Sequence, residues 1–431
     1  MKRIYLLLAA VGAVLAIALA SSSVSAQAPA PTAGTKITGD LREPRGMKVG
    51  PDGMIYVAEA GSGGTTAVGS GDTASMSGNT GRISKIDPAT GTRTTVADNL
   101  PSNATPEGGS LGPADVAFIG TQLYYAQTNG GAAFGFPNNP TGIYKVNSNG
   151  TVTLVADIAK FEDAQPSASS LGDRDPGGNP YSMTVRDGAF FVVDGNQNRL
   201  LKATTAGVVS LVVDWPTDIT TTGITFASSG GPFYVSTLGP FPFAPADGRV
   251  YSVGYPTGSL TQVASGVSSI TDVEFSPSGQ LYALNFADQA PDLSMGPFVP
   301  FSAKVMKVDL STGTFTPIVS GFTFSTNMVF IGDTLYVNSN SISALGPGEI
   351  WKIANFSSIA PLPAAVPTAA APAPTAPAAA PTGAPSGIIA GPNTGTGGMS
   401  NDADSRVWIP MLVLGVIGIL ALTGSIVTKR R

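Results

Sequence analysis

Oxygen-bearing side chains recur at the ends of short apolar segments, an arrangement that can gather the ligands of a hard cation. Asp115, Asp272 and Asn327 stand where three strands are expected to begin. Glu59 and Asp194 stand where two others are expected to end. Because Ca²⁺ takes about six to eight oxygen ligands, these side chains would form a calcium site if the strands brought them together. Alternatively, they hydrogen-bond backbone groups around a water-filled channel.

Two residue types are missing from the chain, and their absence excludes several kinds of chemistry. The 431 residues include no cysteine and no histidine. Disulfides, thiolate metal sites, Ser-His-Asp hydrolysis and histidine-bound zinc are therefore excluded. The net charge of −5, with 12% charged residues, comes without the basic stripe of a nucleic-acid-binding protein. Oxygen-ligated Ca²⁺ is the cofactor that remains to be considered.

Aromatic residues gather in the longest segments between the expected strands, where a rigid scaffold usually carries its binding surface. If the rings share one face, they form an apolar patch of the kind that marks a ligand or partner site. Alternatively, they pack the loops onto the strands. The candidate binding residues are Phe134, Phe136, Tyr181, Phe241, Phe243 and Phe298, with Phe286 and Phe301 in the same group of loops.

The elements that must position these residues are six copies of a two-strand unit between Gly46 and Val337. Each copy has two alternating segments joined by a tight turn, as in Met47–Val49 and Ile55–Val57. A third strand follows in every copy and a fourth follows in the first five. This repeat predicts an all-β, six-bladed β-propeller with four-stranded antiparallel blades over residues 36–357. The longest loops are expected on one face of it.

The sixth copy lacks a fourth strand, because the chain runs into proline-rich sequence soon after Ile350–Ile353. Lys36–Leu41, which precedes the first copy, resembles the strand ends that lead into later copies. We therefore expect Lys36–Leu41 to pair beside Ile350–Ile353 as the outer strand of the sixth blade. This pairing would cover an edge that otherwise invites aggregation.

The N-terminal segment has the features of an export signal. Residues 1–26 combine a basic start, an apolar run and a small-residue end, which indicate a cleaved signal peptide. An uncleaved N-terminal anchor is the alternative. Residues 27–35 are expected to be disordered.

The C-terminal segment is expected to anchor the chain. Residues 358–406 are rich in Pro, Ala and Gly and predict an extended stalk. Residues 407–428 carry no charge and predict a transmembrane helix, and the basic tail 429–431 places the C-terminus in the cytoplasm. The stalk segment Gly391-Pro392-Asn393-Thr394-Gly395 is similar to a sortase signal, although that signal normally begins with Leu. Cell-wall attachment is therefore an alternative to a plain membrane anchor.

Several blade segments together resemble a known family. Pro44-Arg45-Gly46, Gly112–Phe118 and Tyr234–Phe243, which ends in Pro-Phe-Pro-Phe, look like the ScyD/ScyE family of exported propellers. NHL and SMP-30-like propellers share the blade pattern, so the Pro-Phe-Pro-Phe loop is the more specific feature. The resemblance covers about residues 36–353. It implies an exported propeller and brings no catalytic residues.

These features predict a monomeric propeller on a bacterial cell surface, extracellular and held by a single membrane pass. We expect a binding or scaffold module for a glycan, a small apolar molecule or an envelope protein, and not an enzyme. The alternative is a Ca²⁺-dependent hydrolase or lactonase that uses the carboxylates near the axis, as SMP-30-like lactonases do.

The predicted topology can be checked by proteolysis of intact cells. A protease added outside should cut within the stalk, residues 358–406, and release a soluble propeller, because proline-rich extended chain is accessible to proteases. Immunoblotting of the supernatant measures this release. A propeller that stays protected until the cells are lysed would contradict the topology.

Overall fold

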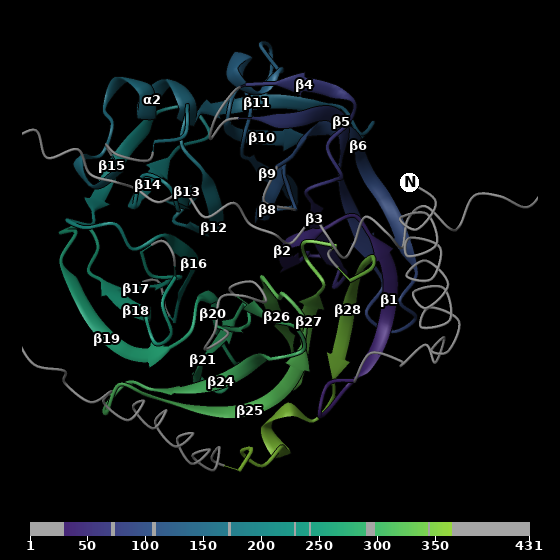
Figure 1. Cartoon of the computed structure of the whole chain (residues 1–431), viewed down its shortest axis with the longest axis vertical. Helices are drawn as coiled ribbons and strands as arrows, with labels where there is room; N and C mark the ends of the chain where they lie inside the picture. Colours follow the sequence, from purple (N-terminus) through teal and green to yellow (C-terminus); the bar gives the residue numbers. More distant parts are fainter. Residues whose placement is uncertain are drawn as a thin grey trace, which may run out of the picture. The chain divides into compact units, whose positions relative to one another are not determined.

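The computed structural model describes residues 30–69, 74–105, 109–170, 174–227, 230–240, 243–289, 298–343 and 345–363. These residues form six antiparallel sheets around a common axis (Figure 1). The predicted six-bladed, all-β propeller is therefore confirmed. The expected signal peptide, most of the stalk, the transmembrane helix and Phe241 lie outside the described residues. Within the described ranges, no helix is long and apolar enough to cross a bilayer.

Four blades keep the simple order in which consecutive strands lie side by side from the axis outward. Blade 2 contains β8 (Pro113–Ile119), β9 (Gln122–Gln127), β10 (Gly142–Val146) and β11 (Val152–Asp157). Blade 3 contains β12 (Pro180–Arg186), β13 (Ala189–Asp194), β14 (Arg199–Ala203) and β15 (Val209–Asp214). Blade 4 contains β16 (Thr221–Phe226), β17 (Phe233–Thr237), β18 (Gly248–Val253) and β19 (Leu260–Val267). Blade 5 contains β20 (Ile270–Phe275), β21 (Leu281–Asn285), β24 (Ala303–Asp309) and β25 (Thr314–Phe322).

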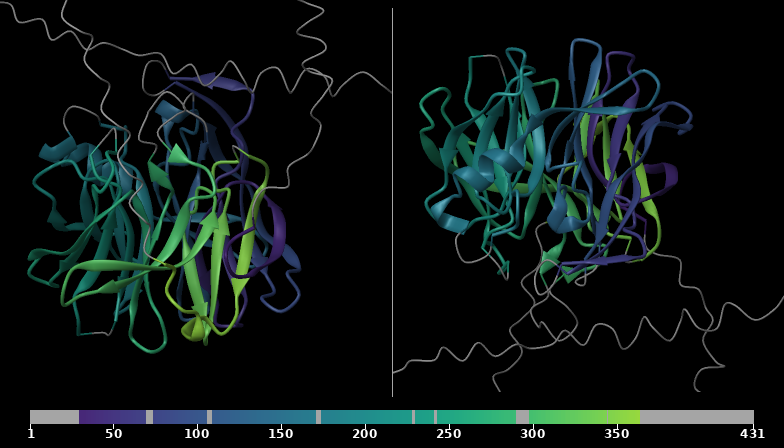
Figure 2. Two further views of the ribbon diagram at one scale, coloured as in Figure 1. Left: turned by 60° about the horizontal axis from the view of Figure 1, so that its bottom comes forward. Right: turned by 90° about the horizontal axis from the view of Figure 1, so that it is seen from above.

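Blade 1 is enlarged, and its extra strands project beyond the ring on one side (Figure 2). It contains β2 (Pro44–Val49), β3 (Ile55–Glu59), β4 (Thr66–Val68), β5 (Ser75–Ile86), β6 (Arg93–Ala104) and β7 (Ser110–Leu111). The remaining loop elements are the hairpin β22 (Asp288–Gln289) and β23 (Phe298–Val299), the helix α2 (Ile158–Ala164), and the 3-10 turns η2 (Ala132–Phe134), η3 (Ala168–Ser170) and η5 (Phe356–Ser358).

Blade 6 is completed by the N-terminal strand, as the sequence predicts. It contains β26 (Met328–Ile331), β27 (Thr334–Ser339), β28 (Gly348–Ile353) and β1 (Thr35–Leu41). Strand β1 pairs antiparallel with β28, with Lys36 opposite Trp351 and Leu41 opposite Gly348. The ordered chain also extends beyond residues 36–357, because Thr32 exchanges hydrogen bonds with Ser320 and the Leu362 N–H donates to the Pro317 carbonyl.

The core consists of six apolar clusters within the described residues, one at each junction between neighbouring blades. At the closing junction, Leu41 and Met47 pack with Val329, Tyr336 and Ile350 of blade 6. Burying a side chain such as Met47 completely is worth about 1.5–3 kcal/mol. Because every blade shares its apolar side chains with two neighbours, losing one strand should weaken the whole ring.

Deleting β1 tests this closure. Removal of residues 27–41 should lower the free energy of unfolding by at least ~3 kcal/mol, since it removes buried Leu41 and opens the edge of β28. Urea unfolding of the purified protein measures the loss. Removal of residues 27–30 is the matched control, because Ala30 is exposed. Equal unfolding midpoints for the two deletions would contradict the closure.

Candidate functional site

Six equivalent residues begin the innermost strands, and we call them the ring positions. Each one is followed directly by a fully buried apolar residue, and together they form an inner ring around the axis. The ring positions in blades 1 to 6 are Gly46, Asp115, Ser182, Gly223, Asp272 and Asn327.

Three ring positions bind the backbone of the next blade. The Met183 N–H donates to Asp115 Oδ2 at 2.8 Å, and the Met328 N–H donates to Asp272 Oδ2 at 2.8 Å. The Met47 N–H donates to Asn327 Oδ1 at 2.9 Å, which joins blade 6 to blade 1. These three predicted metal-ligand candidates therefore hold neighbouring blades together.

The two glycines of the ring leave room for the carboxylates beside them. A Cβ on Gly46 would lie 2.0 Å from Asp115 Oδ1, and a Cβ on Gly223 would lie 2.6 Å from Asp272 Cα. Real Cβ atoms do not approach other atoms so closely. The absence of a side chain at Gly46 of blade 1 therefore makes room for Asp115 of blade 2. In the same way, Gly223 of blade 4 makes room for Asp272 of blade 5.

A lysine lies among the axial carboxylates. Lys48 Nζ is 3.9 Å from Asp115 Oδ2. Burial alone would lower the pKa of Lys48, but the charges of Asp115, Glu274 and Asp272 outweigh it and raise that pKa. Burial also raises the pKa of each of these three carboxyl groups. Lys48 is therefore a charged ammonium that partly neutralises them.

The other two predicted metal ligands have different partners. Glu59 is fully buried and accepts two hydrogen bonds from Arg82, at 2.7 and 2.6 Å. It also accepts the Arg42 N–H at 2.7 Å, which fixes the segment between β1 and β2. Asp194 is fully buried and accepts the N–H groups of Asn179 and Gln197, each at 2.8 Å. Both carboxylates organise the backbone where they stand.

The five predicted ligands do not come together as one calcium site. Within the described ranges, no group of three or more His, Cys, Asp or Glu residues is placed to hold a metal ion. The physical reason is that the five residues have separate partners. The three ring positions bind the backbone of the next blade, whereas Glu59 and Asp194 bind groups of their own blades.

The residue just before each ring position decides how tightly neighbouring blades meet at the loop-bearing end. In blade 4, Thr222 Oγ1 donates to the Ile270 carbonyl of blade 5 at 2.7 Å. In blade 5, Thr271 Oγ1 donates to the Ser325 carbonyl of blade 6 at 2.9 Å. In blade 6, Thr326 Oγ1 donates to the Pro44 carbonyl of blade 1 at 3.1 Å. Three successive junctions are thus closed by equivalent threonine hydroxyls.

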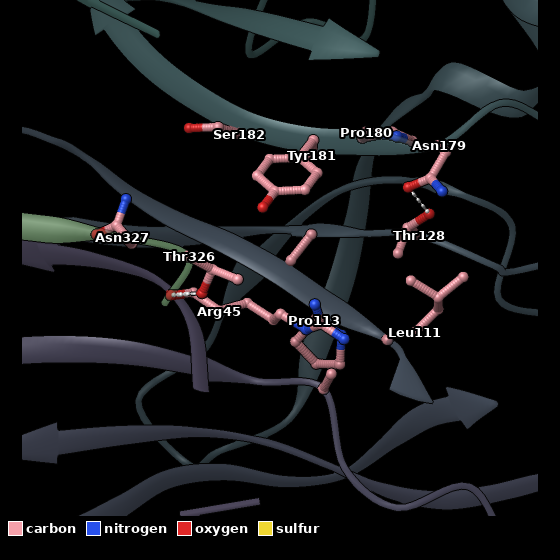
Figure 3. Close-up of a pocket in the computed structure, with 14 residues that line it drawn as sticks. Arg45, Leu111, Pro113, Thr128, Asn179, Pro180, Tyr181, Ser182, Thr326 and Asn327 are labelled. Carbon is pink, nitrogen blue, oxygen red and sulfur yellow. Dashed lines mark hydrogen bonds between the residues drawn. The ribbon is translucent and has the colours of Figure 1, made fainter. Parts of the chain in front are cut away.

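Blades 1, 2 and 3 have Arg45, Ala114 and Tyr181 at this position instead of threonine. All three line a cavity of about 30 Å³, together with Thr326 and Asn327, and we call it the mouth cavity. This volume holds roughly two water molecules or the end of a larger ligand. Figure 3 shows Tyr181 and Arg45 lying on opposite sides of it.

Two hydrogen-bond donors of the mouth cavity are unused. Arg45 Nη2 donates to the Ser110 carbonyl at 2.6 Å, but its buried Nε has no hydrogen-bond partner within the described part of the chain. Burial raises the pKa of the Tyr181 phenol, so the hydroxyl keeps its proton. Arg45 is itself held by Glu43, at 3.4 Å.

The predicted aromatic patch exists in part. The half-buried rings of Phe243, Phe298 and Phe286 form a row with nearly buried Phe324, with successive centroids 6.3, 5.0 and 5.2 Å apart. We call these four residues the aromatic row. It combines loops of blades 4 and 5 with the connection into blade 6.

Phe134 is not part of an exposed patch. Its ring is 2% exposed, and its carbonyl accepts hydrogen bonds from Ser77 and Asn103. Phe136 is half-buried in the same loop. These two residues therefore fit the alternative in which aromatic side chains pack a loop onto its blade.

Sequence reasoning missed Arg45, Lys48 and Phe324. A signal for Lys48 was available, since it is the only basic residue at the second position after the ring position, where the other blades have Ala, Thr, Glu or Val. Arg45 could be found by aligning the residues before the ring positions, which separates the three threonine blades from the other three.

No protein-family model and no curated protein matches the chain. Among solved structures, it is similar to a PQQ-bound aldose sugar dehydrogenase from Streptomyces coelicolor, with 11% identity, 75% of this chain and 98% of that chain covered, and a TM-score of 0.48. It is also similar to a catalytically inactive virginiamycin B lyase from Staphylococcus aureus, with 12% identity, 75% and 99% coverage, and a TM-score of 0.42. A chain of a nidogen/laminin complex has 12% identity, 61% and 84% coverage, and a TM-score of 0.41.

These likenesses show the propeller fold alone, and the proteins that share it include enzymes as well as a component of a protein complex. The prediction that this chain is not an enzyme is therefore wrong, because enzymes are among the proteins that share its fold. At such low identities, no activity of these proteins is transferred to this chain.

The axial lysine gives a testable consequence. Lys48→Met should lower the free energy of unfolding by about 2–3 kcal/mol at pH 7, because buried carboxylates lose their compensating charge. The raised carboxyl pKa values mean that the loss should shrink as the pH falls and the carboxylates take up protons. Urea unfolding at pH 5 and pH 7 measures both effects.

Lys85→Met is the matched control. Lys85 pairs with Asp52 at 3.5 Å, with both side chains more than a third exposed. Such surface pairs contribute about 0–1 kcal/mol. Equal costs for the two substitutions would show that Lys48 does not compensate the axial carboxylates.

Proposed function

We propose that this protein is a surface-anchored, monomeric binding module that recognises a glycan at the loop-bearing end of its propeller. The observation that carries the proposal is the mouth cavity, where the threonine contacts of blades 4 to 6 are replaced by Arg45, Ala114 and Tyr181. Binding is a step that receptors and enzymes share, so the proposal holds for a catalytic or a non-catalytic module.

The mouth cavity suits an uncharged oxygen-bearing group. Arg45 Nε–H and the Tyr181 hydroxyl are donors that a sugar hydroxyl or carbonyl oxygen can accept from. Charges of both signs act on the Tyr181 phenol: burial raises its pKa most, the Arg45 charge lowers it, and the charges of Asp272 and Asp115 raise it. A neutral polar group that accepts hydrogen bonds is compatible with these mixed charges.

The aromatic row is linked to this cavity through the chain. Phe324 is two residues from Thr326, which lines the cavity, and Phe286 stacks on Phe324. Phe298 and Phe243 follow in the row. A sugar ring has an apolar face that packs on aromatic rings and hydroxyls that need hydrogen bonds. This combination favours a glycan over a small apolar molecule or an envelope protein, the other two ligand classes that the sequence suggested.

The cell-surface part of the proposal depends on the sequence. The signal peptide of residues 1–26, the stalk, the transmembrane helix of residues 407–428 and the ScyD/ScyE resemblance all favour an exported, anchored chain. The sortase-like segment at residues 391–395 offers covalent attachment to a cell wall as the other means of display.

The calcium-dependent hydrolase has less support than glycan binding. It requires axial carboxylates with oxygens available to a metal, and Asp115 and Asp272 instead accept N–H groups from the next blade. No specific contact of the described residues favours it.

Replacing Tyr181 tests the proposal. The full-length protein is screened on a glycan array, and the dissociation constant of the best glycan is measured by calorimetry. Tyr181→Phe should weaken binding about tenfold, the effect of losing one hydrogen bond of ~1.4 kcal/mol. The melting temperature should change little, because the hydroxyl makes no hydrogen bond within the described part of the chain.

Tyr282→Phe is the matched control, since Tyr282 is the second residue of β21, near a short turn at the other end of the blade. It should bind as the unmodified protein does. Equal affinities for the Tyr181 and Tyr282 variants would place the glycan elsewhere, and no binding to any glycan would refute the ligand class.

A further inference from the structure

A second buried charged cluster lies away from the axis, where α2 packs against blade 3. Its members are Glu162 of α2, Asp194 at the end of β13, Arg199 at the start of β14 and Asp214 at the end of β15. Glu162 and Asp194 are 0% exposed and Arg199 is 2% exposed. Burying charges is costly unless they are paired, so the pairing within this cluster decides its protonation.

Arg199 uses its donors on two carboxylates and a carbonyl. Nε and Nη2 bind Asp214 at 2.7 and 3.1 Å, which is a bidentate ion pair. Nη1 donates to Glu162 Oε2 at 2.5 Å and to the Gln165 carbonyl at 2.7 Å. The other oxygen, Glu162 Oε1, is buried and has no hydrogen-bond partner among the residues that the structure describes.

Asp194 lies beside Glu162. A Cβ on Gly178 would lie 2.3 Å from Asp194 Oδ2 and 3.1 Å from Glu162 Cγ, so both carboxyl side chains pack against the same glycine. Asp194 accepts N–H groups from Asn179, Asn196 and Gln197 at 2.8, 3.1 and 2.8 Å. Its negative charge is therefore well stabilised by backbone dipoles.

The cluster has one positive group for three carboxyl groups, of which Glu162 and Asp194 are buried and Asp214 has a side chain that is 37% exposed. The neighbouring charges do not change this balance, because Arg174 is paired with exposed Asp163 at 2.6 Å. Among the residues that the structure describes, the other charged groups on the elements around Glu162 are Asp157, Lys160, Asp175 and Lys145 of β10, and Lys160 is exposed. A surplus of buried negative charge is relieved when one carboxyl group takes a proton.

We propose that Glu162 is a proton-binding site, with the proton on Oε1, and that this proton latches α2 and segment 175–179 onto blade 3. The geometry identifies Oε1 because Glu162 Oε2 and both carboxylate oxygens of Asp194 already accept hydrogen bonds. When the proton leaves, two buried carboxylates repel each other and the latch loosens.

The direction of the pH effect follows from linkage. Burial first, and then the charge of Asp194, raise the pKa of Glu162 to about 8 from an ordinary value of 4.5. Burial raises the pKa of Asp194 to about 6. A folded-state pKa above the unfolded value gives stability that is complete below pH 4.5 and lost as the pH rises towards 8. The latch is therefore closed in mildly acidic surroundings and open in alkaline ones.

The latch also controls one wall of the mouth cavity. Asp194 Oδ2 accepts the Asn179 N–H, and Asn179 Oδ1 accepts a hydrogen bond from Thr128 Oγ1 at 3.0 Å. Asn179 and Thr128 both line the cavity. This consequence rests on the proposed function, whereas the proton site itself does not.

Amide hydrogen exchange of the full-length protein tests the proposal. After correction for intrinsic exchange rates, the opening equilibrium constant of residues 158–164 should increase on the order of 100-fold from pH 6 to pH 9. This change follows if the pKa of Glu162 is about 8 in the closed state and 4.5 in the open state. Glu162→Gln stays neutral and should abolish this increase. Lys160→Gln, at an exposed position of α2, should keep it.

A second measurement covers the case in which Glu162→Gln does not fold. Carboxyl ¹³C NMR of the unmodified protein should show one glutamate that titrates near pH 8. No such titration, or a full pH dependence in Glu162→Gln, would overturn the latch. Glycan binding takes no part in either measurement, so failure here leaves the proposed function standing, and the reverse also holds.

Discussion

The structure depends on one kind of contact, a side-chain oxygen at the start of an innermost strand that accepts an N–H from the next blade. Asp115, Asp272 and Asn327 each make it. A propeller is stable only while its blades stay in register around the ring, with short, protected sheet edges at its outside. Because these acceptors are buried, an empty position would leave an unsatisfied N–H that costs about 1–3 kcal/mol. Carboxylates that looked like metal ligands are better explained as inter-blade connectors.

The closing junction lies between blade 6 and blade 1, where the two ends of the propeller segment come together. Three separate interactions meet at it. Strand β1 pairs with β28 at the outer edge, and Asn327 accepts the Met47 N–H at the axis. Between them, Asn338 Nδ2 donates to the Arg45 carbonyl at 2.6 Å, while its Oδ1 accepts the Thr326 and Asn327 N–H groups. One buried amide thus links the last blade to the first and positions Arg45 at the mouth cavity.

The sequence predicted the blades and their closure, because alternating segments and turn residues report local backbone conformation directly. It predicted the aromatic row only in part, since a phenylalanine in a loop has the same local pattern whether it is buried, as Phe134 is, or half-buried, as Phe298 is. It gave no indication that Glu162 is buried, because this residue pairs with Arg199 across more than thirty residues. Such long-range contacts leave no local periodicity to detect.

The two halves of the ring differ in the residue that precedes the ring position. Blades 4, 5 and 6 place threonine before the ring position, and each threonine closes the junction to the next blade. Blades 1, 2 and 3 lack this hydroxyl, so their junctions open into the mouth cavity, and the compensating support comes from loops. Glu43 holds Arg45 in blade 1, and Asp194 holds Asn179 ahead of blade 3. Both supports are buried carboxyl groups whose pKa values burial raises. The supports of the mouth cavity are therefore proton-binding groups, as are Asp272 and Glu274 of blade 5, whose pKa values burial also raises.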